Sequence, residues 1–288
     1  MKSVNLLLIT IFLFFTLGCS LTKNQKKGSV FPEEFDYETE FTTLKTILII
    51  PAKINEVTKN FLFDTGADLN VIQRDSTFGK ISEVSGASNR KMKMGEENVP
   101  SIKIGDVEFK NTFAQNGNLV GLKEQIPNFG GILGQPAISK ANWLIDYLNK
   151  KIRISNQNLV DNSFKTIRIK RERGAPYTYI SINGTEYKVI VDLGSSSEFS
   201  LPKESKLAKQ LLLKYKFEDN ERERWTIGGS QIIKEKVGVI PLVKLGDIEF
   251  KDVSTKINVQ SQPRIGVGFF KDCIIYIDNL EGNYKIKK

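Results

Sequence analysis

Alternating apolar and polar positions, the pattern of β-strands, recur through the chain after residue 45. Residues 46–66 ("TILIIPAKINEVTKNFLFDTG") and 176–194 ("PYTYISINGTEYKVIVDLG") each give an apolar strand, a tight connection and a second strand. The Asn-Gly pair at 183–184 is a strong hairpin signal, and the Asn-Glu pair at 55–56 has the corresponding place in the first segment. The pattern therefore predicts two similar hairpins, each ending on an Asp that is followed two residues later by Gly.

The same order of motifs continues downstream of both hairpins, which indicates an internal repeat. The matching pairs are "IKIGDVEFKN" (102–111) with "VKLGDIEFKD" (243–252), "GGILGQP" (130–136) with "RIGVGFF" (264–270), and "WLIDYLNKKIRI" (143–154) with "IYIDNLEGNYKI" (275–286). Together with the two hairpins, these pairs make four correspondences that occur in the same order, which predicts two copies of a β-rich unit. We expect an all-β protein with minor helix, a first unit at 46–157 and a second at 158–288.

The second unit is longer between its Asp and the Gly-Asp turn, and the extra residues predict a helix. Pro202 occupies a favourable first helical position, and Leu207, Leu211 and Tyr215 lie four apart on one face. We expect a short amphipathic helix packed against the second unit, and no function is assigned to it.

Composition and charge exclude several classes of active site and argue against nucleic acid as a partner. The 288 residues are 40% hydrophobic and 26% charged, which is typical of a globular protein, and they include no histidine. The usual Ser/His/Asp, Cys/His and paired-histidine zinc sites are therefore excluded, and no metal or cofactor is indicated. The net charge is +9, but the basic residues are scattered, which favours a solvated surface over nucleic-acid binding.

The N-terminus has the pattern of an export signal. An apolar stretch from Val4 to Leu17 precedes Gly18 and Cys19, and it is short for a membrane span. The segment "TLGC" resembles the lipobox of bacterial lipoproteins, with Thr16 in place of the usual leucine, and the alternative is an ordinary signal peptide or membrane anchor with a chance cysteine. The lipobox reading predicts a signal peptide at 1–18, lipidation of Cys19, a flexible tether at 19–45, and a lipid-anchored protein of the bacterial cell envelope that faces the periplasm or the exterior. Cys273 is then left without a disulfide partner and is expected to be buried.

The two Asp turns carry a resemblance to a known family. A strand ending in Asp-Thr-Gly-Ala at 64–67, followed by Ile-Leu-Gly at 132–134, is similar to the retropepsin-like aspartic proteases, and the repeat resembles their single-chain, two-lobed form. The resemblance covers roughly residues 46 to 288. It implies two acid-protease β-barrel lobes, a peptide or protein as substrate, and a monomer that needs no dimer to complete its site. It also implies that Asp64 and Asp192 share one proton and act together on a water. The alternative is that each Asp only caps a turn.

The resemblance assigns supporting roles residue by residue. Thr65 would brace the dyad across the interface, Gly66 and Gly194 would let the turns fold closely, and the Ser195 hydroxyl would hydrogen-bond an active-site carboxylate. Asp68 would contact the substrate backbone or, equally well, cap its turn in solvent. Segments 84–96 and 224–233 are candidate flaps; in the second, Gly228 and Gly229 resemble a flap tip that binds substrate, although Gly-Gly is also a common hairpin turn.

Leu193 departs from the family pattern, which has Thr or Ser between Asp and Gly. Leucine cannot return the hydrogen bond of Thr65, so half of the brace is missing, at about 1 kcal/mol for an ordinary hydrogen bond. Three hypotheses remain: an active aspartic endopeptidase, a peptide-binding envelope protein that has lost efficient hydrolysis, and a self-processing protease with few turnovers. Adjacent carboxylates would favour the first hypothesis, whereas a wide gap or a salt-bridged Asp192 would count against it.

Overall fold

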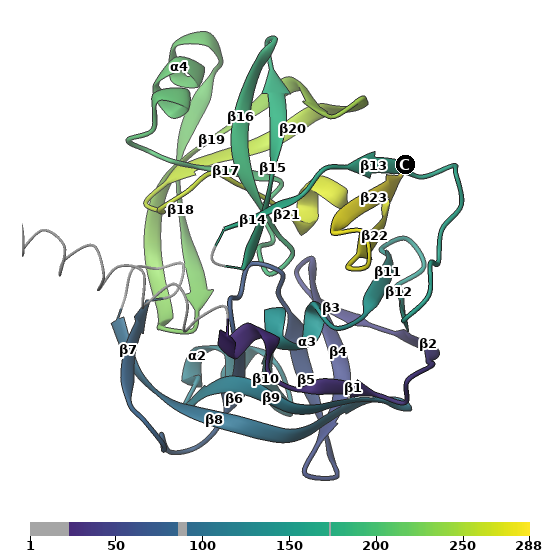
Figure 1. Ribbon diagram of the computed structural model, residues 1–288. Helices are drawn as coiled ribbons and strands as arrows, with labels where there is room; N and C mark the ends of the chain where they lie inside the picture. Colours follow the sequence, from purple (N-terminus) through teal and green to yellow (C-terminus); the bar gives the residue numbers. More distant parts are fainter. Residues whose placement is uncertain (1–22, 86–90, 173) are drawn as a thin grey trace, which may run out of the picture.

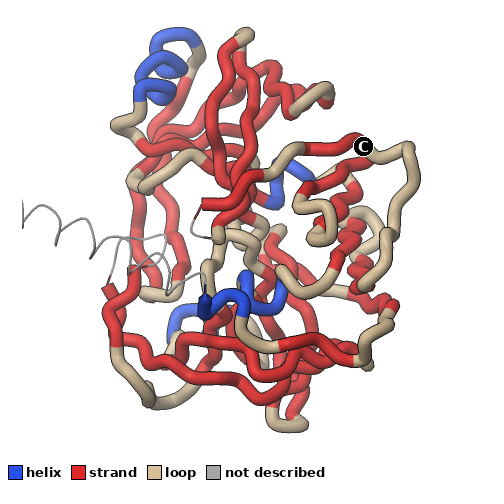
Figure 2. Tube along the Cα trace, in the orientation of Figure 1, coloured by secondary structure: helices blue, strands red, loops and turns tan. Residues whose placement is uncertain are grey.

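Strands dominate the fold. The computed structural model describes residues 23–85, 91–172 and 174–288, and Figures 1 and 2 show several twisted sheets with a few short helices. The prediction of a mostly β protein with minor helix is confirmed. Three sheets organise the described residues: one for each half of the chain and one that both halves share.

The first-half sheet has nine strands. Eight of them follow the order β1-β9-β6-β10-β5-β4-β8-β7, and β3 pairs with β4 outside this order. Its strands are β1 (Ser29–Phe31), β3 (Thr42–Leu44), β4 (Ile47–Ile54), β5 (Val57–Phe63), β6 (Asn70–Gln73), β7 (Ser82–Ser85), β8 (Lys91–Ile104), β9 (Val107–Gly117) and β10 (Phe129–Leu133).

The second-half sheet repeats this arrangement with eight strands in the order β14-β15-β16-β21-β17-β20-β19-β18. They are β14 (Lys170–Glu172), β15 (Ala175–Ile182), β16 (Thr185–Asp192), β17 (Phe199–Pro202), β18 (Phe217–Thr226), β19 (Gly229–Leu245), β20 (Ile248–Asn258) and β21 (Arg264–Gly266). In both halves the strand that leads to the Asp turn pairs in parallel with a short later strand, β5 with β10 and β16 with β21. The predicted repeat is thus present in the topology.

The shared sheet joins the halves. Its order is β13-β23-β22-β11-β12-β2, so the first half supplies three neighbouring strands and the second half the other three. The strands are β2 (Asp36–Glu40), β11 (Asn142–Asp146), β12 (Lys151–Ser155), β13 (Lys165–Ile167), β22 (Ile274–Asp278) and β23 (Asn283–Lys287). The central pair β11 and β22 is antiparallel, which gives the sheet a pseudo-two-fold arrangement. The two units are therefore fused through continuous hydrogen bonding rather than simply placed side by side.

The prediction of a flexible tether through residue 45 is wrong for residues 23–45. Strands β1, β2 and β3 lie in this segment, and Phe35 and Phe41 are buried. The charged residues of β2 face oppositely charged residues of β12: Asp36 pairs with Arg153 and Glu38 with Lys151. Edge strands of this kind are held by main-chain bonds and cross-strand charge pairs, so the segment lacks the apolar periodicity from which strands are recognised.

The predicted signal peptide and the lipidation of Cys19 lie outside the described residues. No helix within the described part of the chain is long and apolar enough to cross a membrane.

The predicted helix in the second half is α4 (Lys206–Lys214), and Leu207 and Leu211 lie on its buried face. Its start differs from the prediction: Pro202 ends β17, and Ser205 is the N-cap, whose hydroxyl accepts a hydrogen bond from the Ala208 N–H. A Ser cap satisfies a free N–H of the first turn, a role that Pro does not serve.

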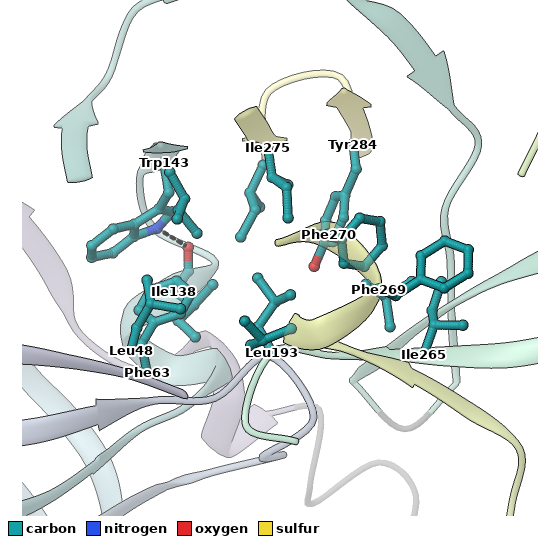
Figure 3. Close-up of a cluster of buried hydrophobic side chains, with 14 of the residues drawn as sticks. Leu48, Phe63, Ile138, Trp143, Leu193, Ile265, Phe269, Phe270, Ile275 and Tyr284 are labelled. Atoms are coloured by element: carbon teal, nitrogen blue, oxygen red, sulfur yellow. Dashed lines mark hydrogen bonds between the residues drawn. The ribbon is translucent and has the colours of Figure 1, made fainter. Parts of the chain in front are cut away.

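The hydrophobic core runs through the junction of the two halves. Figure 3 shows Leu193 between Ile138 of the first half and Phe270 of the second, with Trp143 nearby. Ile138 belongs to helix α3 (Gln135–Ile138) and Phe270 to the equivalent 3-10 helix η1 (Val267–Phe270), and the Trp143 indole N–H donates to the Ile138 carbonyl at 2.8 Å. Cys273 is buried, as predicted, and burial raises the pKa of its thiol to about 11.

Candidate active site

The two predicted Asp turns have the same local geometry. Asp64 follows the last residue of β5, and Asp192 ends β16. The Gly66 N–H donates to Asp64 Oδ1 at 2.8 Å, and the Gly194 N–H donates to Asp192 Oδ1 at 3.0 Å. Each turn therefore fixes its own carboxylate through the glycine two residues later.

The turns pack against one another, so each glycine lies beside the opposite carboxylate. A Cβ atom on Gly194 would lie 2.2 Å from Asp64 Cγ, and one on Gly66 would lie 2.9 Å from Asp192 Cγ. Real Cβ atoms do not approach other atoms this closely, so a side chain at either place would displace the opposite carboxylate. The tertiary structure brings Asp64, Gly66, Asp192 and Gly194 into one site, although 128 residues separate the two carboxylates.

The two carboxylates interact electrostatically. Burial raises the pKa of Asp64 well above its usual value, and the negative charge of Asp192 and a hydrogen bond between the two side chains raise it further. The Gly66 N–H and the Arg264 cation act in the opposite direction but do not cancel the effect. Asp64 thus keeps its proton to higher pH than an isolated aspartate, as expected when a second carboxylate lies close to it.

Arg264 forms an ion pair with Asp192. The Arg264 Nη1 group contacts Asp192 Oδ2, and the two side chains are 14% and 6% exposed. In the strand register, Arg264 lies opposite Ile190 of β16, as Ile132 lies opposite Leu62 of β5. The second half thus has a cation where the first half has an isoleucine. This ion pair is the feature that counts against catalysis, while the close approach of the carboxylates counts in its favour.

The Thr65 brace is present, and its counterpart is replaced by packing. The Thr65 hydroxyl donates to the Val191 carbonyl at 2.8 Å and accepts from the Leu193 N–H at 3.0 Å. The Leu193 side chain cannot form the reciprocal bonds, and it is fully buried in the core between the halves. One half of the brace is therefore polar and the other is apolar.

Under the endopeptidase hypothesis, Leu193→Thr is expected to raise peptide turnover about 2- to 5-fold, because a second hydroxyl would complete the brace by symmetry. The same change removes buried apolar volume, so the free energy of unfolding should fall by about 1–3 kcal/mol. Hydrolysis rates and thermal unfolding of Leu193→Thr and Leu193→Val separate the two effects, since valine creates a similar loss of volume without a hydroxyl. Unchanged or lower hydrolysis by Leu193→Thr would contradict the brace argument.

A cleft of about 1170 Å³ lies over the two carboxylates, and its two walls differ in character. The first-half wall is mainly apolar, with Leu44, Ile47, Leu62, Val71, Val84, Leu122 and Ile132. The second-half wall is mainly polar and basic, with Lys188, Ser197, Ser200, Arg222, Arg224, Asn258 and Arg264. A cleft of this size can hold several residues of an extended peptide.

The β18–β19 hairpin crosses from the second half to helix α2 (Val120–Gln125) of the first half (Figure 1). A Cβ on Gly121 would lie 2.9 Å from Gly229 Cα, so the hairpin tip rests directly on α2. The residues of this hairpin that line the cleft are Arg222, Arg224, Trp225, Thr226 and Ile227. The structure thus bears out a hairpin over the cleft at 224–233, but it places Gly228 and Gly229 at the tip and not among the described residues that line the cleft.

The other candidate flap is the β7–β8 hairpin. Strand β7 pairs with residues 91–94 of β8, and Val84 lines the cleft. Residues 86–90, which include part of the predicted segment 84–96, lie outside the described residues.

Asp68 and Ser195 both line the cleft, as expected for residues beside the dyad. The Asp68 carbonyl accepts from the Gln25 side chain at 3.0 Å. Ser195 contributes through its main chain: its N–H donates to the Asp192 carbonyl, and its carbonyl accepts from the Val267 N–H. Among the described hydrogen bonds, none joins the Ser195 hydroxyl to a carboxylate, so the predicted role of that hydroxyl is not seen.

Two features of the site escaped the sequence-based interpretation. The arginines Arg224 and Arg264 were not predicted: matching "GGILGQP" with "RIGVGFF" residue by residue places Arg264 at Gly130, and only the strand register makes it equivalent to Ile132. Gln135 was also missed: its side-chain amide donates to the Thr65 carbonyl at 2.7 Å and so stabilises the main chain of the first Asp turn. No pattern in the sequence marks that contact.

Within 23–85, 91–172 and 174–288, no group of three or more Cys, Asp or Glu side chains is placed to hold a metal ion. No protein-family model and no curated protein sequence matches the chain.

Proposed function

We propose that the protein is an aspartic-type endopeptidase of the retropepsin-like kind, with two lobes that correspond to the two halves of the chain. The observation that carries the proposal is the pair of equivalent Asp-X-Gly turns, whose carboxylates meet at the floor of a peptide-sized cleft. One chain supplies both carboxylates, so the proposed active form is a monomer. The shared sheet and the cross-interface bonds of Thr65 hold the two turns in fixed relative positions.

The proposed reaction uses one proton shared by the dyad. The charged Asp192 accepts a proton from a water, whose oxygen adds to the peptide carbonyl carbon, while Asp64 gives its proton to the carbonyl oxygen. The tetrahedral intermediate then collapses: the proton held by Asp192 passes to the leaving nitrogen, the C–N bond breaks, and Asp64 takes back a proton from a hydroxyl of the intermediate, which leaves a carboxyl product and restores the dyad. The raised pKa of Asp64 supports this division of roles in the free protein. The roles belong to the coupled pair, because a shared proton can move between two adjacent carboxylates.

A second candidate is a peptide-binding protein that retains the cleft but hydrolyses poorly. The ion pair between Arg264 and Asp192 favours it, because the Arg264 guanidinium occupies Asp192 Oδ2, an oxygen that would otherwise accept a proton from water. The same ion pair is compatible with the endopeptidase if a bound peptide draws Arg264 away from Asp192.

Digestion of an unbiased peptide mixture distinguishes the two candidates. The form beginning at residue 20 is incubated with the mixture from acidic to neutral pH, and products are identified by mass spectrometry. We expect internal cuts, with activity reaching well above the usual pKa of an aspartate before it declines, because the decline reflects loss of the Asp64 proton. Peptides that bind to the protein but stay intact across the whole pH range would favour the binding protein.

We further propose that Cys19 carries a lipid anchor in the bacterial cell envelope, on the strength of the "TLGC" segment after the apolar stretch. The mass of the mature N-terminal peptide tests this directly. A mature chain that begins elsewhere, or an unmodified Cys19, would contradict it.

A further inference from the structure

Equivalent positions of the two cleft walls differ systematically in polarity. In the first half, β10 places Ile132 beside Leu62 of β5 and Val71 of β6. In the second half, the same register places Arg264 beside Ile190 of β16 and Ser200 of β17. All six residues line the cleft. An apolar trio on one side therefore faces a trio with a cation and a hydroxyl on the other.

Donors without a partner gather on this second-half wall. Among the described residues, Arg264 Nε, Arg224 Nη1 and Ser200 Oγ are buried and make no hydrogen bond. Buried donors in folded proteins are nearly always paired, so three unpaired donors around one cleft call for an acceptor that is not part of the chain. A carboxylate has two oxygens and can accept several such bonds.

The charges on this wall point to an anion. Arg222 already has a partner, because its Nε–H donates to Glu235 Oε1 at 2.7 Å and Glu235 is buried. Arg224 forms no ion pair among the described residues: burial lowers its pKa, the nearby cations of Arg264 and Arg222 lower it further, and the carboxylates of Asp192 and Glu235 offset this only in part. A negative group bound between Arg224 and Arg264 would relieve this repulsion, and planar guanidinium groups match carboxylates in geometry.

We infer that the second-half wall of the cleft binds the side-chain carboxylate of a Glu or Asp residue in the peptide, through Arg224 and Arg264. The facing first-half pocket around Leu62, Val71 and Ile132 then takes an apolar side chain. This inference deepens the proposed function, since it names the substrate class of the same cleft. It also explains how Asp192 becomes available for catalysis, because the bound carboxylate competes with Asp192 for Arg264.

The test compares peptides that differ only in this charge. A synthetic library with amidated C-termini and blocked N-termini is digested, and the cut sites are aligned. We expect Glu or Asp to be enriched at one position close to the cut and apolar residues on the other side of it. For a chosen peptide, kcat/KM should be roughly 10- to 100-fold higher with Glu than with Gln at that position, as expected for a charge-assisted contact.

Arg224→Gln should bring the Glu-to-Gln ratio close to one while the apolar preference remains. Lys236→Gln is the matched control: it removes one cation from the same hairpin, but Lys236 pairs with the exposed Asp219 and does not line the cleft. Its ratio should equal that of the wild type. Arg264→Ile provides a second variant, in which position 264 has the same residue type as Ile132, its equivalent in the first half. At the peptide position near the cut, this variant should prefer Leu over Glu. Thermal unfolding of each variant checks that it is folded.

Measurements of peptide binding, made beside those of cleavage, distinguish a failure of this inference from a failure of the proposed function. If the wild-type protein cuts Glu and Gln peptides equally well, the inference is overturned and the endopeptidase stands. If it cuts neither but binds the Glu peptide at least 10-fold more tightly, and Arg224→Gln loses this difference, the inference stands and the endopeptidase falls. Equal binding of both peptides without cleavage would overturn both.

Discussion

Asp64→Asn and Asp192→Asn are each expected to lower the rate of peptide hydrolysis by about 10²- to 10⁴-fold, the usual contribution of a general acid or base. An amide cannot exchange the proton that the mechanism requires, but its oxygen can still accept the N–H of Gly66 or Gly194. The turns should therefore keep their shape. Initial rates on a peptide cut by the wild type measure the effect, with Asp106→Asn, in the exposed β8–β9 turn, as the matched control.

The same two substitutions should change stability in opposite directions. The folded pKa of Asp64 lies above its ordinary value of 3.8, so the folded state holds this proton more tightly than the unfolded chain does. Stability from this group is fully present below the ordinary pKa and is lost as pH rises through the raised folded pKa. Asp64→Asn removes that loss, so its Tm should exceed that of the wild type by about 2 °C or more near pH 7, and by little near pH 3.

Asp192→Asn should instead destabilise the protein, by about 1–3 kcal/mol, because it leaves the largely buried Arg264 without its anionic partner. Thermal unfolding of both variants between about pH 3 and pH 8 tests these signs. If both variants lose hydrolysis but their Tm values do not shift in opposite directions, the charges at the dyad differ from those inferred from the ion pair. Full hydrolysis by either variant would rule out the two-carboxylate mechanism.

Gly194→Ala is expected to lower hydrolysis by about 100-fold or more, because a catalytic group displaced by about 1 Å loses activity on that scale. The new methyl would lie 2.2 Å from Asp64 Cγ and 2.5 Å from each of its carboxylate oxygens, so the carboxylate must move. Gly66→Ala should have a smaller effect, because its Cβ would lie 2.9 Å from the nearest atoms, those of the Asp192 carboxylate.

Gly117→Ala is the matched control for both substitutions. Its Cβ would meet no atom closer than Met94 Cε at 3.6 Å, so the methyl fits without movement and activity should stay at the wild-type level. Rates measured on one peptide should fall in the order Gly117→Ala, Gly66→Ala, Gly194→Ala. Wild-type activity in Gly194→Ala would mean that the second turn does not lie against Asp64 in the working protein.

The repeat, the predominance of strands and the two Asp turns could all be predicted from the amino-acid sequence. These features follow from short-range patterns: alternating apolar residues predict strands, and Asn-Gly or Gly-Asp pairs predict turns. The helix at 206–214 was predictable for the same reason, within a few residues of its start. Two copies of the pattern in one order were sufficient to pair Asp64 with Asp192.

The way the two halves join and the residues that surround the dyad could not be predicted from the sequence. Strand β2 belongs to the shared sheet through cross-strand charge pairs, which leave no apolar period in the sequence. Arg264 reaches Asp192 because the register of β21 on β16 places it there, and Arg224 comes from a hairpin that begins 25 residues after Asp192. Ion pairs and cleft walls depend on distances between segments remote in sequence, and local patterns carry no information about those distances.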